Sequence, residues 1–289
     1  LWVGPCWLKI AKIVGSDFTI AMVNLPILDD HSRAVIIQTI HELIEGEKCD
    51  AIHFGPLAEN YPALEWLVES ASDSDRVEVL RNHVQSPYSL FSLPESFAKY
   101  MESLDNRQRG NLRRGRNLVE RELDLSLDLV TDMATIEHEI AQFIALHTAQ
   151  WRQDGKQGHF NDWPEAGEFN TKMATKQAER NRLRLLRFRG KNGVIAYELC
   201  YAFGNRWFWR LPARVVGQEW DRYSLGRICL SKVLESAIAE GAREVDGGAG
   251  HYDYKVRLGA TEHSLRSVLL VRRAAFCKLR GRLFLRLSD

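Results

Sequence analysis

The stretch that decides the fold, Ser224–Gly259, reads SLGRICLSKVLESAIAEGAREVDGGAGHYDYKVRLG. Its apolar residues predict a helix over Leu225–Glu240, and a short strand over Arg243–Asp246 follows before a glycine-rich turn. The pair Tyr254-Lys255 comes soon after that turn. Because a helix start offers unpaired backbone N–H groups and the positive end of the helix dipole, this order predicts an anion site. A phosphate-bearing acyl donor such as coenzyme A has the chemistry that such a site binds.

Three strands are predicted immediately upstream of this stretch. Leu183–Arg189 and Val194–Phe203 flank a Gly-Lys-Asn-Gly turn, and Arg206–Leu211 follows a Gly-Asn turn, so the three form an antiparallel meander. Further upstream, Thr135–Gln153 carries apolar residues along one helical face, and Phe169–Arg180 is predicted as another helix. The C-terminal part is therefore predicted as a meander followed by a helix and further strands.

The N-terminal part alternates between strand and helix patterns, which indicates an α/β layer. The predicted strands are Phe18–Leu25, Ala51–Phe54 and Val77–Val84, and the predicted helices are Ser32–Glu45 and Pro62–Ser70.

The character of the sequence changes at residues 86–94, which we interpret as the domain junction. It divides the chain into residues 1–88, an N-terminal α/β half, and residues 89–289, a C-terminal domain. Ser92 with Glu95 three residues later predicts a capping box that opens the next helix. A run of six arginines follows within residues 106–122, and it suits either phosphate contacts or an exposed, solvated helix.

Composition limits the classes of function. The 289 residues are 45% hydrophobic and 27% charged with a net charge of +1, so the chain as a whole is not built to bind polyanions. Five widely spaced cysteines without a CxxC pair argue against a disulfide framework or a zinc site, and they indicate a reducing cytoplasm. No apolar run reaches the length of a membrane helix, so no stable membrane insertion is expected. The basic, amphipathic KLRGRLFLRL segment suits either weak contact with a membrane surface or a last packed helix.

The order meander, loop, helix, strand resembles the GNAT acyltransferase fold, and the chain resembles the CelD-like acetyltransferase family, which is related to the FemAB-like aminoacyl transferases. The pieces that carry the resemblance are PESFAKYMESLDNRQRGNLRRGRNLVERE (94–122), ALHTAQW (145–151), YSLGRICLSKVLESAIAEGAREVDGG (223–248) and YDYKVRLGA (252–260). The resemblance implies an α/β (α+β) fold with a GNAT-like mixed sheet flanked by helices. It also implies two GNAT-like halves, the first of them degenerate or truncated.

The resemblance places the pyrophosphate of an acetyl-CoA or other acyl-CoA donor at the start of the Leu225–Glu240 helix, and it implies no metal. The predicted donor-binding residues are Ser224, Leu225, Gly226, Arg227 and, for the acyl arm, Trp209. Gly226 permits close approach of a ligand to the backbone. A plain Ser-capped helix start remains the alternative interpretation.

The resemblance implies a role near the donor for Lys255 and a loop with His159 and Asp162 that faces the acceptor, whereas Glu198 and Asp246 are candidates from their own positions in and after strands. The candidate catalytic residues are Lys255, Tyr254, Glu198 and His159, and the candidate substrate-binding residues are Trp151, Asp162 and Asp246. Lys255 is expected to stabilise negative charge that develops during transfer, and a tyrosine to protonate the leaving thiolate. Glu198 faces either the site, with a raised pKa, or solvent. Asp246 is more often a turn cap, Trp151 more often core, and His147 on the helix of Trp151 more often a hydrogen-bonded core histidine.

Three functions remain open. The first is transfer of an acyl group from coenzyme A to an amine or hydroxyl of a small-molecule or glycan acceptor, such as a polysaccharide precursor. The second keeps the fold but takes aminoacyl-tRNA as donor, favoured by the arginine run and by the single glycine at Gly226 where the GNAT phosphate motif has two small residues. The third is a non-catalytic scaffold in exopolysaccharide assembly.

Overall fold

A computed structural model describes residues 2–3, 6–13, 29–46, 48–59, 62–72, 74–161 and 163–288. The chain forms two compact units, Leu1–Tyr88 with His263–Asp289, and Ser89–Glu262. The predicted junction coincides with the boundary after Tyr88. The residues from His263 onward, which we assigned to the second domain, group instead with the first unit, because β11 (Thr261–Arg272) pairs with β4 (Ala51–Ala58).

The first unit packs helices on both faces of a sheet in the order β3-β4-β11-β5. Its further elements are β1 (Trp2–Val3), β2 (Cys6–Trp7), β3 (Ile10–Lys12), β5 (Val77–Ser92), α1 (Asp30–Glu45), α2 (Pro62–Ser72) and α10 (Ala275–Ser288). Alternate residues of β11 serve the two faces: Val268 and Leu270 pack with α1 and α2, whereas Leu269 and Val271 pack toward α10. The strand predicted at Phe18–Leu25 lies outside the described residues.

The second unit contains the predicted meander and the helix-strand unit that follows it. Its sheet elements are β6 (Ser126–Val130), β7 (Leu183–Gly190), β8 (Gly193–Phe203), β9 (Arg206–Arg214) and β10 (Glu244–Ala249). Strands β6 to β9 pair antiparallel in chain order, and β10 returns parallel to β9 after the crossover helix α8 (Leu225–Ala239). The predicted mixed sheet flanked by helices is therefore confirmed.

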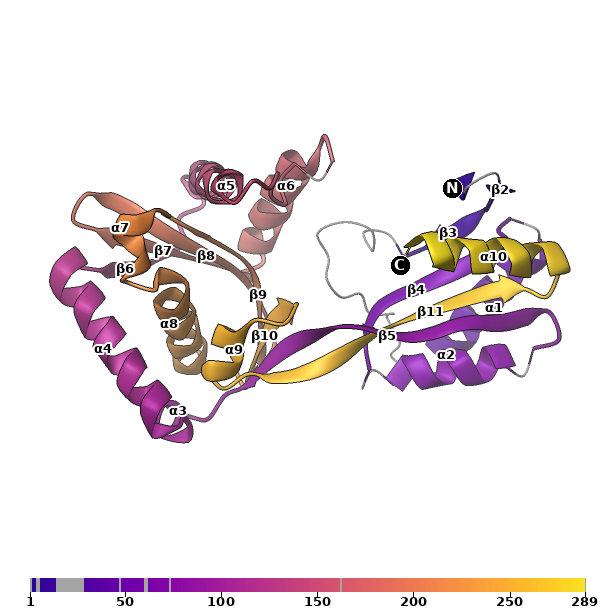
Figure 1. Ribbon diagram of the computed structural model, residues 1–289, viewed down its shortest axis with the longest axis horizontal. Helices are drawn as coiled ribbons and strands as arrows, with labels where there is room; N and C mark the ends of the chain where they lie inside the picture. The colour runs from indigo at the N-terminus through magenta and orange to yellow at the C-terminus, as the bar shows by residue number, and fades with distance from the viewer. Residues whose placement is uncertain are drawn as a thin grey trace. The chain divides into compact units, whose positions relative to one another are not determined.

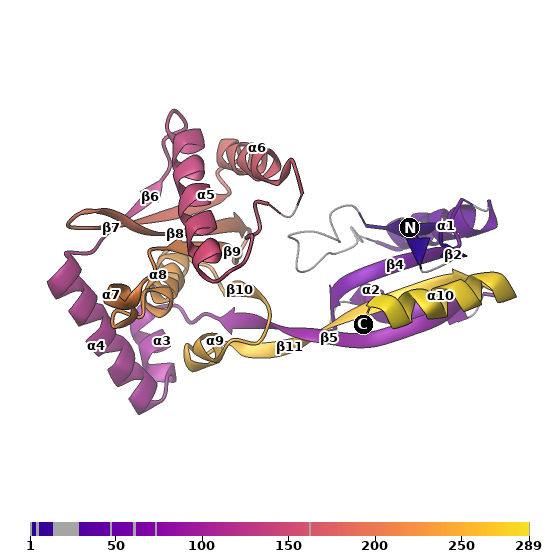
Figure 2. The ribbon, with the colours of Figure 1, turned by 45° about the horizontal axis from the view of Figure 1, so that its top comes forward.

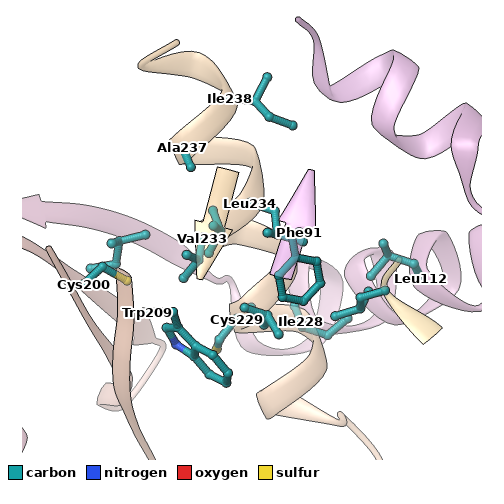
Figure 3. Close-up of a cluster of buried hydrophobic side chains, with 14 of the residues drawn as sticks. Phe91, Leu112, Cys200, Trp209, Ile228, Cys229, Val233, Leu234, Ala237 and Ile238 are labelled. Carbon is teal, nitrogen blue, oxygen red and sulfur yellow. The ribbon is translucent and has the colours of Figure 1, made fainter. Parts of the chain in front are cut away.

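Helices cover both faces of the second unit's sheet (Figures 1 and 2). One face carries α5 (Ile136–Gln153) and α6 (Ala166–Glu179), and the other carries α8 with α3 (Phe97–Ser103) and α4 (Asn106–Leu123). Figure 3 shows the α8 side, where Ile228, Val233 and Leu234 lie among Trp209 and Cys200 of the sheet and Leu112 of α4. The core thus fixes α8 between the sheet and the arginine-rich helix.

Two local predictions at the edges of this unit were wrong. The capping box at Ser92 does not form, because Leu93 N donates to Arg243 O and keeps the chain extended; Ser96 caps α3 instead, accepting from Lys99 N at 3.3 Å. The glycines after Asp246 do not form a separate turn, because β10 continues through Gly247 to Ala249.

The adjacent strands β9 and β10 separate from each other within the sheet. Their pairing ends at Asp246↔Phe208, although β9 continues to Arg214 and β10 to Ala249. A β-bulge lies at the same place, since Cys200 pairs with Trp209 and Leu199 with Leu211, which leaves Arg210 as an extra residue. Trp207 and Trp209, before the bulge, face α8, whereas Leu211 and Ala213, after it, face α5. The bulge therefore reverses the alternation of β9 at the point where its pairing with β10 has ended.

The described residues contain no helix long and apolar enough to cross a membrane. Across the same residues, no group of three or more His, Cys, Asp or Glu side chains is arranged to hold a metal ion. Cys49, Cys200, Cys229 and Cys277 are buried free thiols.

Candidate active site

A cavity of about 390 Å³ opens at the start of α8, between the end of β9 and the short helices α7 (Gln218–Asp221) and α9 (Asp253–Arg257). Its lining is Arg214, Val215, Val216, Trp220, Asp221, Ser224, Leu225, Gly226, Arg227, Tyr254 and Arg257. The cavity therefore brings together the segment predicted to bind the donor and one of the predicted catalytic residues, Tyr254. All of its walls belong to the second unit.

The helix start in this cavity has no side-chain cap. Ser224 adopts a left-handed conformation (φ 49°, ψ 45°), and its hydroxyl makes no capping hydrogen bond, so a Ser-capped start is ruled out. The amides of Arg227 and Ile228 donate to Ser224 O at 3.0 and 3.2 Å. Within the described structure the amides of Leu225 and Gly226 have no acceptor, so two donors and the positive end of α8 face the cavity.

Three guanidinium groups surround these amides. A Cβ on Gly226 would lie 3.3 Å from Arg214 Cζ, so the Arg214 guanidinium rests directly over the glycine. Arg227 is half-buried, and burial together with the charge of Arg257 lowers its pKa; its Nε is buried with no partner among the described residues. Arg257 is exposed and pairs with Asp253 at 3.1 Å. The cationic groups outnumber the one carboxylate of the lining, Asp221, so the cavity favours an anion.

Glu198 of β8 lies on the α8 face of the sheet, beside Trp209, and is not part of the cavity lining. It is 1% exposed, and its carboxylate accepts a hydrogen bond from Trp209 Nε1, so the solvent-facing interpretation is wrong. Burial raises its pKa to about 8, against the opposing effects of the Trp209 bond and the charge of Arg214. Burial also raises the pKa of Tyr254, and the charge of Glu198 adds to that rise. Glu198 is thus electrostatically coupled to a cavity wall.

Lys255 is buried beside the point where β9 and β10 separate, and it does not line the cavity. Its Nζ donates to Gly247 O at 2.7 Å and lies 4.6 Å from the ring centroid of Tyr252 and 5.4 Å from that of Trp209. Burial lowers the pKa of Lys255 to about 8, opposed by the negative charges of Asp246 and Glu262. The ammonium therefore sits among aromatic faces and a strand-end carbonyl.

Asp246 acts as a backbone cap at the same strand end. Its Oδ1 accepts from Gly248 N at 2.9 Å, and burial raises its pKa. Its Oδ2 is buried with no partner in the described part of the chain. The side chain therefore shapes the end of β10 and contributes negative charge near Lys255.

The remaining candidates lie on the opposite, α5 face. His147 is fully buried, its Nδ1 lies 2.7 Å from Pro212 O, and its Nε2 lies 3.1 Å from His159 Nδ1. Because a carbonyl only accepts, Nδ1 of His147 carries the proton, and burial lowers the pKa of His147 to about 4. The ring of Trp151 packs edge-on against His159 at 4.8 Å. Asp162 lies outside the described residues.

The site contains residues that sequence reasoning missed. Arg214 and Arg257 were not proposed, although both line the cavity. Arg257 could have been predicted from the sequence, because it lies two residues after Lys255 in the quoted stretch. Arg214 could not, because nothing in the sequence around a single arginine at the end of a strand indicates that it lies beside a helix start.

Comparison with known proteins agrees with this arrangement. The family model described as "Acetyltransferase (GNAT) domain" matches residues 106–256, more than half of the chain. No curated protein matches. Three solved structures share the fold at 11–12% identity, a level that shows the fold alone.

The first is the C-terminal domain of a "Putative Lysylphosphatidylglycerol Synthetase" from Agrobacterium fabrum, with 12% identity, a TM-score of 0.58, and coverage of 88% of this chain and 78% of the other. The second is a conserved protein of unknown function from Bacteroides thetaiotaomicron, with 11% identity, a TM-score of 0.57, and coverage of 84% of this chain and 76% of the other. The third is L-PGS from Bacillus licheniformis, with 11% identity, a TM-score of 0.56, and coverage of 88% of this chain and 79% of the other. The family match, over the very elements that build the cavity, means that the chain belongs to the GNAT acetyltransferase family and is an acyltransferase.

Proposed function

We propose that the protein transfers an acyl group from acyl-CoA, with acetyl-CoA as the simplest donor, to an amine or hydroxyl acceptor. The observation that carries the proposal is the start of α8: two amides without an acceptor in the described structure, Leu225 and Gly226, facing a cavity that also holds Arg214 and Arg227. Backbone N–H groups at a helix start together with guanidinium groups are a recurrent solution for binding a pyrophosphate.

The separation of β9 and β10 supports a donor whose pyrophosphate lies at the start of α8 and whose acyl end lies between these two strands. Beyond Phe208 and Asp246 the two strands no longer pair with each other, so we place the amide-bearing arm of the donor between them. Lys255 occupies this region, and we assign it the role of stabilising negative charge that develops there.

Two further side chains suit proton transfer. Glu198, with a pKa of about 8, changes protonation near neutral pH, which is the property required of a general base. Tyr254 lines the cavity with its pKa raised, so its hydroxyl stays protonated and is able to donate to a leaving thiolate. Acyl-CoA, when bound, would supply the activated thioester and leave as coenzyme A; these residues supply orientation and protons.

We assign the acceptor to the α5 face, at Trp151 and His159. The flat ring of Trp151 and the polar edge of His159 are a suitable pair for a sugar, whose ring has apolar faces and polar edges. His147 links this cluster to β9 through Pro212 O, beyond the bulge. A sugar or polysaccharide precursor is therefore our proposed acceptor class.

Aminoacyl-tRNA is the second candidate donor, and the arginine-rich helix α4 is the observation that favours it. The structure assigns much of that charge to internal contacts, however. Arg116 pairs with Glu235 at 2.7 Å, Arg109 bonds to Leu104 O at 3.2 Å, and Arg121 pairs with Glu122 at 3.0 Å. Since fewer arginines remain for a nucleic-acid backbone, acyl-CoA is the better-supported donor.

Calorimetry with acetyl-CoA tests the donor. We expect binding by the wild-type chain, weakened at least about tenfold in Arg227→Ala, since a hydrogen bond to a charged group contributes roughly 1.5–3 kcal/mol. Arg113→Ala is the matched control, because this arginine is exposed on α4 and does not line the cavity. Release of free thiol with a panel of amino sugars and polyols then tests the acceptor class.

The outcomes separate the three functions. Absence of acetyl-CoA binding, together with steeply salt-dependent tRNA binding, would replace the donor by aminoacyl-tRNA. If the chain binds neither acetyl-CoA nor tRNA, and Lys255→Ala still binds a partner protein as the wild type does, the result would favour the non-catalytic scaffold.

A further inference from the structure

A second cavity of about 200 Å³ adjoins the first, and it shares Arg227 and Arg257 with it. Its other lining residues come from the first turns of α4: Arg107, Gln108 and Asn111. Three guanidinium groups and two side-chain amides therefore converge, and no carboxylate is part of the described lining. The composition is that of a site for a compact anion with several oxygen acceptors.

The packing of α4 on α8 builds this second cavity. A Cβ on Gly115 would lie 2.9 Å from Ile228 Cδ1 and 3.5 Å from Arg227 Nη2, so the glycine lets α4 lie close to α8 at this point. That approach holds the Arg227 guanidinium at the wall common to both cavities. Its buried Nε has no partner among the described residues, which is costly for a cationic group unless a ligand completes its shell.

The site depends on side chains rather than on the helix start of α4. Asp105 already caps α4, accepting from Gln108 N at 2.8 Å. Arg107 is exposed and takes part in no ion pair between described residues, whereas Arg257 shares its charge with Asp253. The net charge of the lining is therefore positive even after the one neighbouring ion pair is counted.

The size of the cavity separates it from a second cofactor pocket. Pockets for drug-sized ligands span about 300–1,000 Å³, so a cavity of about 200 Å³ suits a single phosphate-sized group. Because it shares two arginines with the donor cavity, a ligand that carries two separated anionic groups is able to fill both at once.

We propose that this second cavity binds a phosphomonoester on the nucleotide part of the donor, distinct from the pyrophosphate at α8: the 3′-phosphate of coenzyme A. The proposal rests on the proposed function and deepens it. The doubly negative charge of a phosphomonoester near neutral pH matches the cationic lining. Arg227 and Arg257 would then contact both anionic groups, whereas Arg107 would contact the phosphomonoester alone.

Calorimetry with coenzyme A and 3′-dephospho-coenzyme A, at one fixed ionic strength, tests the proposal. For the wild-type chain we expect the dephospho form to bind at least about tenfold more weakly, because charge-assisted hydrogen bonds are lost. Arg107→Ala should reduce the affinity for coenzyme A by a similar factor and leave the affinity for the dephospho form unchanged. Arg113→Ala, on the same helix and outside both cavities, should change neither affinity.

Three results would overturn the proposal, and they are distinguishable from one another. Equal affinity of the wild-type chain for both ligands would remove the second site while leaving the proposed acyl-CoA donor in place. An equal loss of affinity for both ligands in Arg107→Ala would show that Arg107 contacts a part of the donor other than its phosphomonoester. Binding of neither ligand would overturn this site and the proposed function together.

Discussion

Replacement of Glu198 by glutamine isolates the cost of a buried carboxylate. Glu198 is 1% exposed, and burial raises its pKa from 4.5 to about 8. Between pH 4.5 and about pH 8, Glu198 keeps its proton in the folded chain but has released it in the unfolded chain, so the folded state binds more protons. Stability must therefore fall as pH rises through this window, by up to about 1.4 kcal/mol per pH unit.

The integrated effect has an upper bound of about 5 kcal/mol, since the shift spans roughly 3.5 pH units. Glu198→Gln removes the ionisation but keeps an oxygen that can accept from Trp209 Nε1. The variant should exceed the wild type by less than about 1 kcal/mol at pH 5 and by several kcal/mol at pH 8.

Urea unfolding of both chains at pH 5, 6, 7 and 8, followed by tryptophan fluorescence, measures this difference. Glu179→Gln, a replacement of a partly exposed carboxylate on α6, is the control and should change stability by a small, pH-independent amount. If the wild-type and Glu198→Gln curves run parallel, Glu198 is already ionised in the folded state, and its role as a base near neutral pH is wrong.

Three further replacements test other parts of the site. Gly226→Ala should leave stability unchanged or raise it by up to about 1 kcal/mol, because alanine favours a helix and the Arg214 guanidinium that its Cβ would contact is flexible. The affinity for acetyl-CoA, measured by calorimetry, should nevertheless fall about tenfold. An unchanged affinity would contradict a close approach of the donor to Gly226. Between pH 8 and 10.5 the unfolded chain retains a proton at Lys255 that the folded chain has lost, so the stability of the wild type should rise with pH. Lys255→Met should abolish this rise. Urea unfolding across that range measures it, and an equal dependence of stability on pH in both chains would refute the prediction. Gly247→Ala should lower stability by roughly 1–3 kcal/mol, because its Cβ would lie 3.0 Å from Phe91 Cε2 and 3.2 Å from the backbone oxygen of Ser89; an unchanged melting temperature would contradict the tight packing.

The helix-strand unit and the meander were predictable because their signals are local. The apolar period of Leu225–Glu240 and the turns beside Gly190 and Gly204 depend only on neighbouring residues, and the structure confirms those elements. The prediction of an anion site at the start of the Leu225–Glu240 helix followed from the same patterns.

Features that depend on distant pairings were not predictable. The bulge at Arg210 arises from the register between β8 and β9, yet it decides that Leu211 and Ala213 face α5 rather than α8. The capping prediction at Ser92 failed for a similar reason, because Leu93 bonds to Arg243 across the fold. The grouping of β11 with the first unit likewise requires its pairing with β4, more than 200 residues earlier.

The most direct test of the account is a crystal structure of the chain with acetyl-CoA. We predict that the pyrophosphate accepts hydrogen bonds from the amides of Leu225 and Gly226, beside Arg214 and Arg227, with the acyl group between β9 and β10. A donor bound elsewhere on the chain, with those two amides facing solvent, would contradict the central claim.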